Sequence, residues 1–134
     1  MSRILLFIAL VPLCSFAGKA EREYLKSDVT PAITEAEAAF KTACGCTLKI
    51  SLKEDSFKST DDLYKAKHLA EQVKDNVTGY CTDKASKDAI CKMKSLEFAK
   101  TTAAKFTFSG GRGLATTDGQ VVTSWQMITE ELDK

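Results

Sequence analysis

Hydrophobic side chains recur every three or four residues from Ala20 to Ala43, which predicts an amphipathic helix there. Pro31 interrupts the pattern. Because proline is tolerated in the first turn of a helix, either the helix begins at Thr30 or one long helix kinks there. Gly45 is expected to end the helix, since glycine readily adopts the left-handed conformation of helix C-termini. The apolar stripe consists of Leu25, Val29, Ile33, Ala36, Phe40 and Ala43.

Strict alternation of apolar and polar residues from Cys46 to Lys53 predicts a strand with one buried and one wet face. A wet face is typical of antiparallel sheets, because parallel sheets are usually covered on both sides. We therefore expect this strand in an antiparallel sheet.

Two further helices are predicted by spacing and by capping residues. Ser59 or Thr60 is a suitable N-cap for a helix that reaches Tyr80, and Thr82 or Asp83 for a short one that follows. Gly79 is expected near the end of the longer helix.

After Lys94 the chain becomes rich in threonine, valine and phenylalanine, which favours strands. Asp118-Gly119 is a tight-turn signal, and Gly110-Gly111-Arg112-Gly113 is predicted to be a loop. The predicted strands are Leu96–Lys100, Lys105–Ser109, Leu114–Thr117 and Gln120–Val122, and a final short helix holds Trp125, Ile128 and Leu132.

This order of elements predicts an α+β fold, roughly α-β-α-α-β-β-β-β-α. We expect an antiparallel sheet of about four strands with helices packed on one face and two disulfides.

The N-terminus has the pattern of a secretory signal peptide. Arg3 precedes the apolar run Ile4–Phe16, and Ser15-Phe16-Ala17 places small residues at the two positions that a signal peptidase reads. The run is shorter than the roughly twenty residues that a membrane-spanning helix needs, which disfavours a retained anchor. We expect cleavage after Ala17, a single domain at residues 18–134, and a secreted or periplasmic location.

Loss of Arg3 with the leader would leave 18 basic residues against 18 acidic ones, because the full chain has 19 and 18. The charges are mixed along the chain, which is typical of a solvated surface. We therefore expect no nucleic-acid partner, and no membrane partner after cleavage of the leader, since both binding modes need a basic excess.

Cys14 would leave with the signal peptide, and Cys44, Cys46, Cys81 and Cys91 would remain. An even number in an exported domain predicts two disulfides. The favoured pairing joins Cys44 and Cys46 each to the Cys81–Cys91 region. The alternative is a local Cys44–Cys46 ring, which would favour thiol–disulfide chemistry. A zinc site is disfavoured, because Cys81 and Cys91 are too widely spaced to be a ligand pair.

The sequence has no recognisable catalytic set. His68, the only histidine, lies off the apolar stripe of its helix and is expected at the surface. The glycine-rich loop with Gly111 and Arg112 is the first candidate binding surface, because loops on rigid scaffolds often carry function. Trp125 is the second candidate, although a core role that anchors the last helix is favoured. Asn76-Val77-Thr78 matches a glycosylation sequon, which we treat as coincidental.

We therefore expect a non-enzymatic, exported protein-binding module of the inhibitor, immunity or antigen type, with no cofactor and no metal. Its partner would be another protein, and its oligomeric state is left open. The alternative function is a thiol–disulfide redox protein that uses Cys44 and Cys46.

Overall fold

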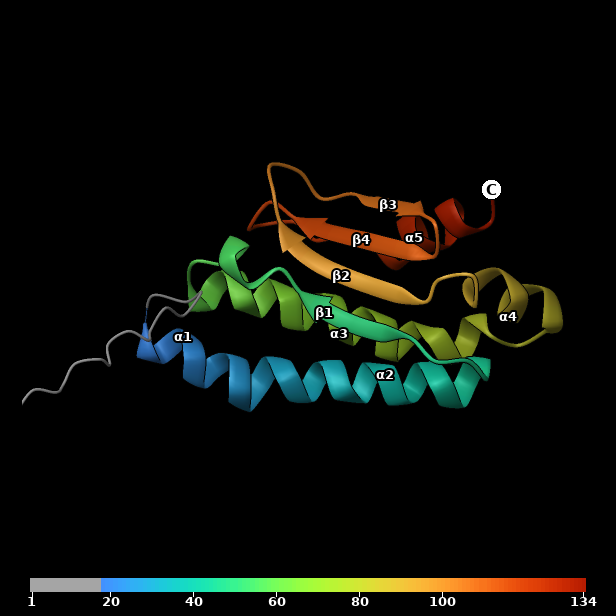
Figure 1. Cartoon of the computed structure of the whole chain (residues 1–134), viewed down its shortest axis with the longest axis horizontal. Coiled ribbons are helices and arrows are strands. Elements are labelled where there is room, and N and C mark those ends of the chain that lie inside the picture. The colour runs from blue at the N-terminus through green and yellow to red at the C-terminus, as the bar shows by residue number, and fades with distance from the viewer. Residues whose placement is uncertain (1–17) are drawn as a thin grey trace, which may run out of the picture.

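The computed structural model describes residues 18–134, in which a four-stranded sheet packs against two long helices, α2 and α3 (Figure 1). The proposed signal peptide, with Cys14 and its cleavage site, lies outside the described residues. The elements, in chain order, are α1 (Lys19–Tyr24), a π-helical turn (Leu25–Val29), α2 (Thr30–Cys44), β1 (Lys49–Leu52), a 3₁₀ turn (Glu54–Ser56), α3 (Thr60–Tyr80), α4 (Lys84–Ile90), β2 (Ser95–Lys100), β3 (Phe106–Ser109), β4 (Arg112–Thr117) and α5 (Trp125–Leu132).

The first helical segment is continuous from α1 into α2, so of the two alternatives the one with a single long, disturbed helix is observed. The disturbance is the π-helical turn, in which the amide of Thr30 donates to the carbonyl of Leu25, five residues back. Pro31 follows at once, and its missing N–H removes one bond of the regular helical ladder. Gly45 ends α2 in the left-handed conformation, with φ of 78°, as predicted.

Side-chain caps set the beginnings of the later helices. Ser59 accepts a hydrogen bond from the amide of Asp62 and begins α3, and Asp83 accepts one from Ser86 and begins α4. Ser124 accepts one from Met127 and begins α5. Short polar side chains at these positions satisfy amides that have no partner within the helix. Since such residues can be recognised in the sequence, all three helices were predicted.

The sheet is mixed, so the predicted antiparallel sheet is wrong. Its strand order is β1-β2-β4-β3, in which β1–β2 and β2–β4 are parallel and only β3–β4 is antiparallel. The crossover through α3 and α4 returns the chain to the starting edge, which makes β2 parallel to β1. The β3–β4 hairpin then places β4 between β2 and β3. Alternation within one strand predicts a wet face, but it does not specify the direction of the neighbouring strand.

The last two predicted strands, Leu114–Thr117 and Gln120–Val122, also differ from the structure. Only Gly110 and Gly111, both with positive φ, form the turn of the β3–β4 hairpin. Arg112 and Gly113, predicted as part of the loop, belong to β4. The predicted strand Gln120–Val122 makes no more than an isolated bridge between Thr117 and Val122, so the end of the chain has one strand fewer than predicted.

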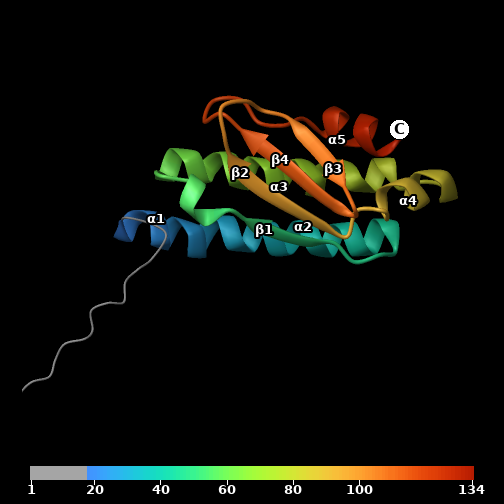
Figure 2. The same ribbon diagram turned by 45° about the horizontal axis from the view of Figure 1, so that its top comes forward.

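The core lies between the helices and one face of the sheet. The apolar stripes of α2 and α3 face each other and the inward side chains of the strands. The largest fully buried side chains come from all of these layers: Phe40, Phe57, Phe98, Leu63, Leu69, Ile90, Met93 and Leu96. In Figure 2 the strands lie in front of α2 and α3, so the other face of the sheet is turned away from the helical layer.

Candidate interaction surface

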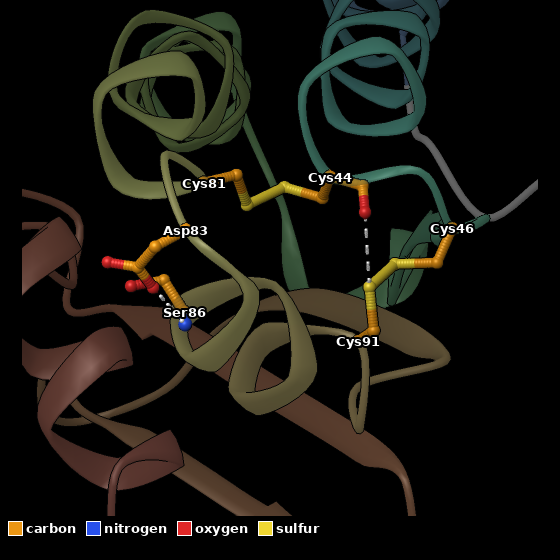
Figure 3. Close-up of a disulfide and its surroundings, with 6 residues drawn as sticks. All are labelled: Cys44, Cys46, Cys81, Asp83, Ser86 and Cys91. Atoms are coloured by element: carbon orange, nitrogen blue, oxygen red, sulfur yellow. Dashed lines mark hydrogen bonds between the residues drawn. A yellow bond between two sulfur atoms is a disulfide. The ribbon is translucent and has the colours of Figure 1, made fainter.

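The four cysteines form two disulfides, Cys44–Cys81 and Cys46–Cys91, with Cα–Cα distances of 5.3 and 6.0 Å (Figure 3). The favoured pairing is confirmed, since each cysteine of the Cys44-Gly45-Cys46 segment joins a distant one. The Sγ atom of Cys91 lies 3.6 Å from the carbonyl oxygen of Cys44, so the bridges lie close together. They connect the end of α2 to the end of α3, and the segment before β1 to the end of α4. The local Cys44–Cys46 ring does not form.

Trp125 lies at the start of α5 and packs edge-on against Tyr80 of α3, with ring centroids 5.8 Å apart. Gln72 of α3 fixes the same region, because its side chain accepts from the amide of Trp125 (3.1 Å) and donates to the carbonyl of Thr123 (2.8 Å). The tryptophan is partly buried against the hydrophobic core. These contacts favour the anchoring role for Trp125 over that of a free surface residue.

Tyr80 holds the far end of α5 as well. Its hydroxyl donates to the carboxylate of Asp133 at 2.9 Å. Burial and this hydrogen bond raise the pKa of Tyr80 to about 12, because both disfavour the phenolate. The α3–α5 contact is therefore made by a neutral tyrosine.

Gly111, predicted in a binding loop, is part of the tight β3–β4 turn. It has φ of 81°, and its carbonyl accepts from the amides of Lys94 (2.7 Å) and Ser95 (3.2 Å). These bonds tie the β3–β4 turn to the start of β2. Arg112, the next residue, is thereby placed at the beginning of β4.

Arg112 is exposed on the side of the sheet opposite to α2 and α3. The strand register places it in one row with Ser95 and Lys49, and the next row contains Leu114, Glu97 and Ser51. Neighbouring strands lie about 5 Å apart, so Lys49 and Arg112 are separated by about 10 Å across the sheet. A hollow of about 350 Å³ opens here, lined by Ser51, Ser95, Glu97, Arg112, Gly113 and Leu114.

We call this the open sheet face and define it by the outward-facing residues Lys49, Ser51, Lys53, Ser95, Glu97, Lys105, Thr107, Ser109, Arg112 and Leu114. Lys53 and Lys105 extend the ladders beyond the strand ends, through bonds to Phe98 and Thr116. Beyond Leu114, the β2–β3 connection covers Thr116, whose hydroxyl donates to the carbonyl of Ala103. The face is therefore open mainly at the amino ends of the three parallel strands.

The open sheet face is basic. Lys49, Lys53, Lys105 and Arg112 surround one acidic residue, Glu97. All five are exposed, and none of them belongs to an ion pair within residues 18–134. The mixed charge pattern of the sequence did not reveal this cluster, because its members lie in or next to four different strands.

Sequence reasoning also missed a contact at the outer edge of the sheet. Glu37 of α2 accepts a hydrogen bond at 2.7 Å from the amide of Ile50, on the unpaired edge of β1. A groove of about 310 Å³ runs along this edge. The carboxylate thus occupies the position that the carbonyl of a further strand would take.

The structure does not bring the remaining candidate residues of the sequence together into one site. His68 is exposed on α3 and makes no hydrogen bond or ion pair in the described part of the chain. Asn76 is exposed within α3 and donates to the carbonyl of Gln72. Arg112 and Trp125, both proposed for binding, lie in separate surroundings, since Trp125 packs on α3 and Arg112 lies on the open sheet face.

Across residues 18–134, no group of three or more His, Cys, Asp and Glu side chains is arranged to hold a metal ion. None of the helices in this range is long and apolar enough to cross a membrane. In comparisons with known proteins, the chain matches no family model, no curated protein and no solved structure.

Proposed function

We propose that this protein is an exported, non-enzymatic protein-binding module of the inhibitor, immunity or antigen type, and that it binds its partner through the open sheet face. The observation that carries the proposal is that three parallel strands expose one face. Parallel sheets are usually covered on both sides. A bare face in such a sheet is therefore a candidate for coverage by another molecule.

The surroundings of this face suit binding. Arg112 supplies planar hydrogen-bond donors and Leu114, beside it in β4, supplies partly buried apolar surface. Two disulfides brace the layer beneath, and a rigid surface loses little conformational entropy on association. Gly111 and Trp125 support the module indirectly, through the hairpin turn and the anchoring of α5.

Two disulfides are compatible with a secreted or periplasmic location. The thiol–disulfide alternative relied on a Cys44–Cys46 ring. Since both cysteines are bonded elsewhere, no geometry favours that alternative, and we do not propose it.

Site-specific photo-crosslinking in the source organism tests the proposal. A photoreactive residue replaces Ser51 or Thr107 on the open sheet face and, as matched controls, Ala38 or Thr42 on the exposed side of α2. We expect a defined protein adduct from the sheet positions and none from the controls. Adducts from the α2 positions alone would contradict the proposed surface.

A further inference from the structure

The fold separates charges that are balanced along the chain. Residues 18–134 contain equal numbers of basic and acidic side chains, yet the open sheet face holds Lys49, Lys53, Lys105 and Arg112 against Glu97. The stretch from Cys91 to Thr117 shows the same bias, since Glu97 is its only acidic residue. Residues 18–134, which are neutral in sum, therefore present one basic face.

Most basic residues in the described part of the chain are in no ion pair, so what distinguishes these four cations is that they lie together on one face of the sheet. Lys74 pairs with Glu35 and Lys84 with Asp88 on the helices, and Lys100 pairs with Asp62 below the sheet. The four cations of the open sheet face have no such partner within residues 18–134. Carboxylates of a second molecule are their natural partners, and Arg112 can bind one through two parallel hydrogen bonds.

We propose that the partner of the open sheet face is an acidic protein segment, with carboxylates for Lys49 and Arg112 and an apolar side chain for Leu114. This inference rests on the proposed function and specifies its partner. Lys49 and Arg112 lie in one row, about 10 Å apart across the sheet. Their long side chains can converge on two carboxylates at alternate residues of an extended segment, which lie about 7 Å apart. Glu97 lies between the cations and disfavours a uniformly anionic surface, such as a lipid bilayer or a nucleic acid backbone.

The probes are three short peptides that alternate threonine with glutamate, with glutamine or with lysine. The glutamate peptide is expected to shift amide NMR signals of β1, β2 and β4, and its binding should weaken as salt is added. The double variant Lys49→Gln/Arg112→Gln should lose about tenfold or more in affinity for it. The matched double variant Lys84→Gln/Lys87→Gln on α4 should bind it like the wild type.

Equal binding of the glutamine or lysine peptide, signal shifts confined to another surface, or undiminished affinity of Lys49→Gln/Arg112→Gln would overturn the inference. So would tighter binding to phosphatidylserine vesicles or single-stranded RNA than to the glutamate peptide. The crosslinking experiment distinguishes failure of this inference from failure of the proposed binding function. If the sheet positions capture a partner equally well in the Lys49→Gln/Arg112→Gln background, the binding function stands and the acidic segment is excluded.

Discussion

At the scale of single residues, Gly113 and Gly79 show how the same residue type serves different needs. Gly113 lies in β4, where a Cβ atom would come within 2.7 Å of Met93 Sδ and 2.8 Å of a ring carbon of Phe106. Met93 is 1 % exposed, so it has little room to move. A Cβ atom at Gly79, in α3, would meet nothing within 4 Å. The core therefore requires a glycine at the first position and not at the second.

We predict that Gly113→Ala lowers the free energy of unfolding by about 1–3 kcal/mol, because the added methyl group overpacks the core. The matched variant Gly79→Ala should raise it by about 0.5–1 kcal/mol, since alanine has the higher helix propensity. Urea denaturation measures both. A Gly113→Ala protein as stable as the wild type would show that this part of the sheet packs less tightly.

Tyr80 predicts a pH dependence at the same scale. Its pKa is raised from 10.0 to about 12 in the folded protein, first by burial and then by the hydrogen bond to Asp133. Folding therefore favours the protonated phenol. The stabilisation is complete below pH 10 and is lost as the pH rises through the folded pKa.

The melting temperature of the wild type should consequently fall more steeply between pH 10 and 12 than that of Tyr80→Phe, which has no phenol to ionise. Both proteins share the loss of lysine ion pairs in this range, so the comparison isolates Tyr80. An equal fall in melting temperature between pH 10 and 12 for the two proteins would contradict the role assigned to the Tyr80 hydroxyl.

At the scale of elements, the edge of β1 is protected by a helix. The unpaired edge of a strand can pair with another chain, and natural proteins often block it. Here Glu37 of α2 takes up the amide of Ile50. The spacing of apolar residues in α2 predicted its buried stripe, but it did not indicate which polar residue would contact an edge strand.

Glu37→Ala should therefore lower the free energy of unfolding by about 1–3 kcal/mol, as expected for a lost hydrogen bond to a charged group. Glu37→Gln keeps an acceptor oxygen and should lose less. Sedimentation velocity should also show more self-association for Glu37→Ala than for wild type. Equal stability of the alanine variant and the wild type would mean that the contact contributes nothing to the fold.

At the scale of the whole molecule, the two disulfides brace one end of both layers. They close chain segments of 37 and 45 residues, for which the chain-entropy model predicts about 4 kcal/mol of stabilisation each. The bridges differ in exposure. Cys44 and Cys81 are 4 % and 6 % exposed, whereas Cys46 and Cys91 are only partly buried.

A small reductant such as a phosphine should therefore cleave Cys46–Cys91 first, since access to sulfur controls the rate. Trapping the free thiols at intervals, followed by peptide mass spectrometry, gives the order. The melting temperature should fall in two steps, with the larger total loss after both bonds are cleaved. Earlier labelling of Cys44 and Cys81 would show that this end of the protein opens locally.

The sequence by itself determined the local structure and the pairing region of the cysteines. Spacing, caps and Gly45 predicted the main helices and their ends, because these signals act within a few residues. Tertiary structure decided the direction of the strands, the insertion of β4 between β2 and β3, and the edge contact of Glu37. It also gathered Lys49, Lys53, Lys105 and Arg112, which lie far apart in the chain, onto one face. Such features depend on which segments become neighbours, and pairing between distant strands leaves no periodic signal within either strand.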